Sequence, residues 1–149
     1  MANQIQLNGN FRRDEGLASG TLKPGMLVSQ TSAAAKTFIA HATEGGFAER
    51  AFVVEDALQG KVVTDSYSTG ALTQVNFVEP GAEIEAIIES GENISIGDQL
   101  ISSGTGTLIS ATGDAASGTD VKQVIAIAQE AIDLSDSDDV DTLAKVRVV

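Results

Sequence analysis

The sequence predicts a mainly β protein: a small β-barrel or β-sandwich-like body with at most one or two short helices and a flexible N-terminal arm. Fifteen glycines separate short runs rich in Val, Ile, Leu and Thr, a spacing typical of strands joined by tight turns. Residues 83–89 begin with the alternation of a half-buried strand, and residues 72–78 and 144–149 have the same β-rich composition. At 149 residues, the chain can bury a core without metals or disulfides.

Turn sequences separate these strands. Residues 79–81, Glu-Pro-Gly, and 90–93, Ser-Gly-Glu-Asn, combine a preset proline angle with glycines that accept positive φ, so a meander is the simplest topology. A shared pattern occurs in residues 22–28 and 94–100, where apolar residues stand three before and three after a glycine. We interpret this pattern as a structural turn that leads into a strand.

Three segments are harder to assign. Residues 32–40 contain an alanine cluster and residues 48–58 contain helix-tolerant positions, although Phe52 and its neighbours could start a strand. Residues 121–132 fit either a helical face or strand alternation, and their many β-branched residues favour a strand. A short helix remains the alternative there.

The first twenty residues differ from the rest. Residues 1–20 are polar and contain few large apolar side chains, so they cannot build a core and are expected to form a flexible arm. The alternation Ile5-Gln6-Leu7 is what a strand donated to another chain's sheet edge needs. We therefore divide the chain into an arm, residues 1–20, and one β-rich domain, residues 21–149.

Composition excludes several classes of chemistry. The chain has no cysteine and a single histidine, His41, which removes disulfides, thiol nucleophiles, Cys-based zinc sites and multi-histidine metal sites. No apolar run approaches the ~18 residues of a membrane span, and residues 1–10 lack a charged-then-apolar signal pattern. We expect a soluble protein with no cofactor and no membrane partner.

Charge is distributed unevenly. The formal net charge is -12, with 9 Lys and Arg against 21 Asp and Glu, and nucleic-acid binding is disfavoured because phosphate contacts need a cationic face. Residues 1–75 hold 6 bases and 7 acids, a net of -1, whereas residues 76–149 hold 3 bases and 14 acids, a net of -11. The first half, with Arg12 and Arg13, could lie against an acidic neighbour, although solubility alone would also explain an acidic surface.

No catalytic constellation is present. His41 has neither a nucleophile elbow nor a second histidine at metal-ligand spacing and is expected to be structural or solvent-facing. The acidic run 136–141 lacks the glycine of a calcium loop, and Gly104-Thr105-Gly106-Thr107 is better explained as a hairpin turn than as a phosphate loop. Lys61 follows a glycine like the modified lysine of a carrier domain, but lacks the residues that flank such a lysine. We therefore predict that the protein is not an enzyme.

Residues 41–61, from His-Ala-Thr-Glu-Gly-Gly-Phe to Leu-Gln-Gly-Lys, resemble head decoration proteins of tailed bacteriophages. The similarity continues, in the same order, through residues 78–84, 91–94, 97–100, 104–108, 128–133 and 145–149. The acidic stretch 135–141 is a departure that resembles an insertion. The resemblance implies a β-tulip-type body and a cement protein that clamps neighbouring subunits of the major capsid protein on the outer surface of the virion, commonly as a homotrimer at local threefold positions.

A cement protein of this kind needs a compact body and contacts that add by avidity, not an active site. For the capsid-binding arm we predict Ile5, Leu7, Phe11, Arg12 and Arg13. A possible oligomer interface would use Phe38, Phe47 and Phe77, although a core position is the default for each. The alternative function is a small β-barrel binding module, either a carrier modified on Lys61 or an adhesive domain for host-surface carbohydrate.

Overall fold

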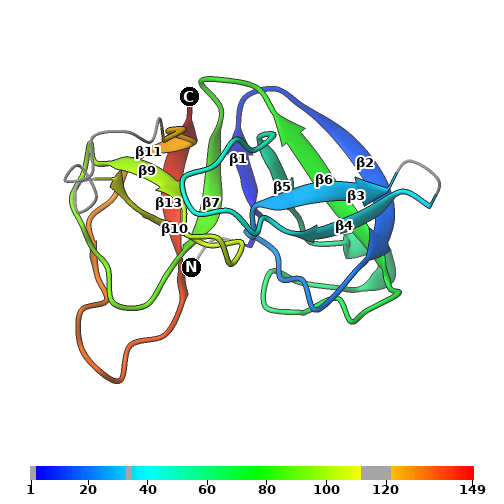
Figure 1. Cartoon of the computed structure of the whole chain (residues 1–149). Coiled ribbons are helices and arrows are strands. Elements are labelled where there is room, and N and C mark those ends of the chain that lie inside the picture. The colour runs from blue at the N-terminus through cyan, green and yellow to red at the C-terminus, as the bar shows by residue number, and fades with distance from the viewer. Residues whose placement is uncertain (1–2, 33–34, 112–121) are drawn as a thin grey trace.

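Two large β-sheets, each curled on itself, lie side by side (Figure 1), and a separate two-stranded sheet pairs residues 93–94 with residues 132–133. The structure is a computed structural model that describes residues 3–32, 35–111 and 122–149. The elements it contains are β1 (Gln6–Asn8), β2 (Phe11–Ala18), β3 (Val28–Ser32), β4 (Thr37–Ala40), β5 (Ala51–Val53), the 3-10 helix η1 (Ala57–Gln59), β6 (Leu72–Val78), β7 (Glu83–Ile88), β8 (Asn93–Ile94), β9 (Gln99–Ser102), β10 (Leu108–Ser110), β11 (Ala126–Ala128), β12 (Ile132–Asp133) and β13 (Thr142–Val148). No described helix has the length and apolar character to cross a membrane.

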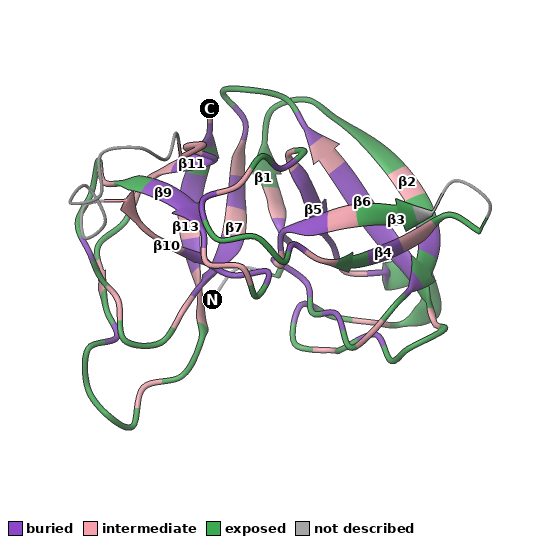
Figure 2. Ribbon diagram, viewed as in Figure 1, coloured by how far each residue is buried: buried purple, intermediate pink, exposed green. Residues whose placement is uncertain are grey.

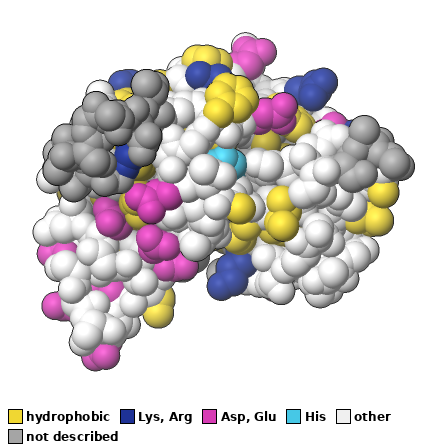
Figure 3. All heavy atoms as spheres, viewed as in Figure 1, with side chains coloured by type: hydrophobic (Ala, Val, Ile, Leu, Met, Phe, Trp, Pro, Cys, Tyr) yellow, Lys and Arg dark blue, Asp and Glu magenta, His cyan; other side chains and the backbone are white. Residues whose placement is uncertain are grey.

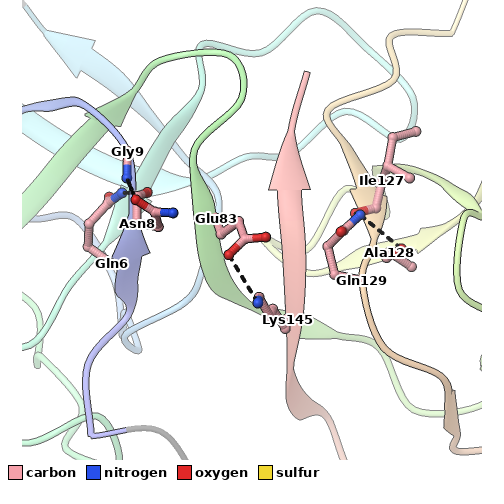
Figure 4. Close-up of polar contacts among 8 residues, drawn as sticks. All are labelled: Gln6, Asn8, Gly9, Glu83, Ile127, Ala128, Gln129 and Lys145. Atoms are coloured by element: carbon pink, nitrogen blue, oxygen red, sulfur yellow. Dashed lines mark hydrogen bonds and ion pairs between the residues drawn. The ribbon is translucent and has the colours of Figure 1, made fainter.

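The C-terminal sheet closes into a five-stranded barrel. Its order is β7-β10-β9-β11-β13, and β13 pairs again with β7 over six residue pairs, from Thr142↔Ile88 to Arg147↔Glu83. β1 also pairs with β7, on the edge that β10 uses further along. A Glu83–Lys145 ion pair of 3.0 Å joins the two strands that complete the ring (Figure 4). We call this unit the C-terminal barrel.

The N-terminal sheet has the order β3-β4-β2-β6-β5. Its longest ladder joins β2 to β6 from Phe11↔Val78 to Leu17↔Leu72. The outer strands β3 and β5 approach each other through a Leu27↔Phe52 bridge, and the Val53 amide donates to the Met26 carbonyl at 2.9 Å. This sheet, which we call the N-terminal sheet, is therefore nearly closed by short contacts instead of a full ladder.

A shared core holds the two sheets together. Leu27 and Phe52, at the seam of the N-terminal sheet, pack in one cluster with residues of the C-terminal barrel such as Ile84 and Leu100. A smaller cluster joins Ile5 and other residues of the N-terminal half to Leu143 of β13. Figure 2 shows buried stretches on both sheets, including β5, β6, β7 and β13. The sheets are thus packed as one body.

The predicted all-β body is confirmed. Residues 72–78, 83–89 and 144–149 contain or overlap β6, β7 and β13. The described part of 121–132 contains β11 and the start of β12, so the strand interpretation is right. Of the segments with helical character, residues 32–40 contain β4, and residues 48–58 contain β5 and the start of η1.

The turn pattern shared by residues 22–28 and 94–100 has the expected geometry. Gly25 and Gly97 have φ of 91° and 94°, and the following amides donate back across the turn, Met26 to Lys23 and Asp98 to Ser95, both at 3.1 Å. Only glycine adopts this backbone conformation without strain. Each turn is followed by a strand, β3 and β9 respectively.

The structure corrects the expected flexible arm. Residues 6–8 and 11–18 form β1 and β2, which pair with β7 and β6, and Ile5 is fully buried. Between the two strands Gly9 has φ of 89°, and a Cβ there would lie 2.5 Å from the Cβ of Ala82. A polar strand can be held by a partner more than sixty residues away, and composition alone gave no sign of that partner.

Candidate functional site

A large aromatic side chain stands in solvent at a well-anchored loop. Phe47 lies between β4 and β5, and its side chain is 85% exposed, whereas the adjacent Ala48 is buried. An exposed phenylalanine held by an ordered backbone exposes apolar surface without the entropy loss that a flexible loop would incur on binding. This residue is the starting point of the candidate site.

His41 fixes the backbone beneath Phe47. Its ring is buried, Nε2 lies 3.0 Å from the Phe47 carbonyl oxygen, and Nδ1 lies 2.7 Å from Ser102 Oγ. A carbonyl only accepts, so Nε2 carries a hydrogen and donates to the Phe47 oxygen, while Nδ1 shares a hydrogen bond with the serine hydroxyl. Ser102 Oγ in turn accepts from the Gly104 amide at 3.2 Å. His41 therefore connects the loop to β9 and its hairpin, which is the structural role expected for it.

A second anchor comes from the segment before β11. Gln123 accepts from the Ala48 amide at 2.7 Å and donates to the Ala48 carbonyl at 3.1 Å. The Gly45 amide also donates to the Ser102 carbonyl at 2.9 Å. Bonds on both sides of Phe47 thus hold the loop against the C-terminal barrel.

Phe47 borders a surface depression of about 420 Å³. The depression is lined by Arg12, Phe47, Ala48, Glu49, Arg50, Phe77, Val78, Glu79 and Pro80. The Arg12 guanidinium lies 4.9 Å from the centre of the Phe77 ring, a cation–π arrangement, and Arg50 Nε donates to the Val149 carbonyl. Arg12, Phe47, Arg50 and Phe77 are named here the Phe47 surface. Figure 3 shows hydrophobic and basic side chains close together along the upper part of the molecule.

The residues predicted for the capsid-binding arm separate into two groups. Ile5 is fully buried in the core, so its assignment to a docking arm is wrong. Leu7 and Phe11 are 39% and 41% exposed, and Arg12 and Arg13 are exposed as well. Arg13 stacks on Phe11 at 5.6 Å and donates from Nε to Asn76 Oδ1 at 3.1 Å. Leu7 belongs to β1 and the other three residues belong to β2, so these four exposed residues lie on paired strands of two different sheets.

The three phenylalanines predicted for an interface occupy different positions. Phe38 is fully buried, 6.4 Å from the Phe77 ring, so it belongs to the core. Phe77 is half-buried and Phe47 is exposed, and both belong to the Phe47 surface. Arg50 was missed because no pattern in the sequence marks it. The neighbouring Phe47 was the only available signal.

The remaining motifs have structural explanations. Residues 104–107 form the hairpin turn between β9 and β10, as predicted. In the acidic run, Asp139 accepts from the Asp136 amide at 3.0 Å and Asp141 from the Ser90 amide at 2.9 Å. Lys61 Nζ lies 5.3 Å from the Tyr67 ring. Residues 3–32, 35–111 and 122–149 contain no group of three or more acidic or histidine side chains that could hold a metal ion.

The fold is similar to that of a solved structure over nearly the whole chain. The N base of head fiber gp8.5 of bacteriophage phi29 superposes with a TM-score of 0.59 and 17% sequence identity, covering 94% of this chain and 95% of that one. No protein-family model matches the sequence. No curated protein matches it either.

Proposed function

We propose that this chain is a structural protein of a tailed-bacteriophage head, a cement protein on the outer surface of the capsid that clamps neighbouring subunits of the major capsid protein. The observation that carries the proposal is the fold shared with the phi29 head-fiber base over 94% of the chain. The resemblance of residues 41–61 to head decoration proteins favours the same proposal. The proposed role of the protein is mechanical and requires no catalysis.

The Phe47 surface is the contact that we assign to the capsid. Exposed aromatic and arginine side chains are the residues that most often dominate binding energy at protein interfaces. The loop anchored by His41 and Gln123 holds Phe47 in position before any partner arrives. In a homotrimer at a local threefold position, three such surfaces would act together, and modest individual contacts would add by avidity.

The test is co-sedimentation with empty capsids of the phage that encodes the chain, prepared without it. We expect saturable binding by the wild type and at least a roughly tenfold weaker affinity for Phe47→Ala. Melting temperature should not change, because the ring is 85% exposed. Leu58→Ala is the matched control, since Leu58 is 99% exposed on η1, away from the Phe47 surface.

Two results would overturn the proposal. A wild-type chain that ignores capsids removes the capsid role altogether. Binding that is unchanged in Phe47→Ala removes the Phe47 surface as the contact while leaving the role in place. Light scattering on the free protein and cryo-electron microscopy of decorated capsids would test the proposed trimer separately.

A further inference from the structure

Strand β2 has an open edge over its first half. The amides of Leu17 and of Ser19, the residue that follows β2, donate away from β6, to the carbonyls of Lys36 and Phe38. Hydrogen-bonding direction alternates along a strand, so the amides and carbonyls of Phe11, Arg13 and Glu15 point to this same side. β4 pairs with β2 only at Leu17 and Ala18, and β2 follows the outer rim of the N-terminal sheet in Figure 1.

Little within the described chain occupies that edge. The Glu15 amide donates to the side chain of Asp14 at 2.9 Å, whereas the amides of Phe11 and Arg13 have no partner within residues 3–32, 35–111 and 122–149. A row of free backbone groups on an exposed strand is a template for another strand. The open edge ends at Leu17, where β2 begins to pair with β4.

Of the charged side chains beside the open edge of β2, some have a partner of opposite charge or a hydrogen bond and others have no ion pair. Lys36 pairs with Asp14 and lowers the pKa of that carboxyl, and Glu15 accepts from Gln74. Among the described residues, Arg12 and Arg13 form no ion pair with a carboxylate. Successive residues of a strand face opposite sides of the sheet, so these two guanidiniums stand on the two faces beside one edge.

We propose that β2 accepts an extended acidic segment of the capsid partner as an added strand, paired to Phe11, Arg13 and Glu15. The inference rests on the proposed capsid role and names the form of the contact. Two successive carboxylates of the incoming strand would meet Arg12 on the face of the Phe47 surface and Arg13 on the other face. Main-chain hydrogen bonds would supply the affinity. The ion pairs with Arg12 and Arg13 would fix the register of the incoming strand on β2.

A second copy of this chain fits the edge poorly. Antiparallel pairing of two β2 edges centred on residue 13 sets Arg13 opposite Arg13, and like charges directly opposite are destabilising. A register centred on residue 14 sets Phe11 opposite Leu17, whose amide is already bonded to Lys36, so only the pair of Arg13 with Glu15 could form. A carboxylate-bearing segment from another protein avoids both problems.

The experiment compares two substitutions at one residue. Arg13→Ala removes the charged side chain together with its hydrogen bond to Asn76 and its stacking on Phe11. Arg13→Pro removes the same side-chain interactions and also the outward amide, and proline is tolerated at an edge position whose amide faces solvent. In capsid co-sedimentation we expect Arg13→Ala to bind several-fold more weakly than wild type, and Arg13→Pro to bind about tenfold more weakly than Arg13→Ala. Circular dichroism and melting temperature verify that both variants are folded.

Hydrogen exchange of the wild type supplies a second measurement that needs no variant. On capsid binding, the amides of Phe11 and Arg13 should become protected, because the added strand would accept from them. Equal binding by Arg13→Pro and Arg13→Ala, or unchanged exchange at both amides, overturns strand addition while wild-type binding preserves the capsid role. Failure of the wild type to bind capsids overturns both.

Discussion

The C-terminal barrel and the N-terminal sheet solve the problem of strand edges in different ways. In the barrel each of the five ring strands has two neighbours, and β7 and β13 complete it over six residue pairs. In the N-terminal sheet the outer strands meet only near Leu27 and Phe52, and β2 keeps an open edge. Charge follows the same division, since residues 76–149 have a net of -11 and residues 1–75 a net of -1.

This difference indicates that the two regions of the molecule have different roles. The acidic, closed barrel offers solvent a surface that repels its own copies. The N-terminal sheet contains the open edge, and its strands and the loop between β4 and β5 contain all four residues of the Phe47 surface. The barrel nevertheless contributes to the site, because Ser102 and Gln123 hold the loop that presents Phe47.

The largest expected effect comes from breaking the seam between the two regions. Phe52→Ala removes a fully buried ring that belongs to the N-terminal sheet but packs with the barrel core. We expect a loss of about 3–5 kcal/mol in the free energy of unfolding, with a single cooperative transition in calorimetry. Two separate transitions in the wild type or the variant would mean that the regions are energetically independent.

A smaller effect is expected inside the N-terminal sheet. Tyr67 is buried and its hydroxyl donates to the Val54 carbonyl at 2.7 Å. Tyr67→Phe leaves that carbonyl without its partner and should lower stability by about 1–2 kcal/mol at neutral pH. Chemical denaturation followed by circular dichroism measures the loss, and no change would mean that water replaces the hydroxyl.

The same tyrosine predicts a dependence on alkaline pH. Burial, with the nearby charges of Asp56 and Glu55, raises the pKa of Tyr67 from 10.0 to about 12. Because the folded state favours the neutral phenol, stability should fall as the pH rises from about 10 towards 12. Tyr67 is the only tyrosine, so tyrosinate absorbance reports its titration directly, and Tyr67→Phe should lack this part of the alkaline loss.

The smallest effect tests the acidic barrel and has the opposite sign. Burial and the neighbouring Glu130 raise the pKa of the Glu85 carboxyl above its usual value. Its charged form is therefore disfavoured in the fold, and the wild type should gain stability from this group as the pH falls through the raised pKa towards the ordinary value of 4.5. Glu85→Gln should be more stable than wild type by roughly 0.5 kcal/mol at neutral pH.

The control for this prediction is Asp138→Asn, which removes the same charge from the exposed acidic loop. We expect it to leave the melting temperature nearly unchanged. If both variants stabilise equally, the gain comes from the net charge of the barrel and the local environment of Glu85 is irrelevant.

Local chemistry predicted much of the fold. Residues 83–88 form a strand whose first residues alternate between half-buried and buried, as their sequence pattern predicts. Residues 72–78 form a strand in keeping with their β-rich composition, although most of their side chains are buried on both faces. The turns at Gly25 and Gly97 followed from glycine's freedom at positive φ. Residues 6–18 were misassigned because a strand rich in charges and polar side chains depends on partners, here β7 and β6, that pattern analysis cannot locate.

The site was predictable only in part. Arg12, Phe47 and Phe77 were candidates from the sequence, but they were placed in two separate roles, arm and interface. The pairing Arg12↔Phe77 on adjacent strands brings them together, and such long-range register is not visible in a single sequence. Phe38 has the same chemistry as Phe47 and lies in the core, because it falls on the inward side of β4.

The pairing of β13 with β7 has a consequence for synthesis on the ribosome. β13 (Thr142–Val148) is the last strand along the sequence, and it bonds to both β7 and β11. Chains are made from the N-terminus at about 5–20 residues per second. The N-terminal sheet can therefore assemble while the C-terminal barrel still lacks β13. Until residue 148 emerges, β7 and β11 each expose a bare edge, and a nascent chain is then most exposed to pairing with the wrong strand.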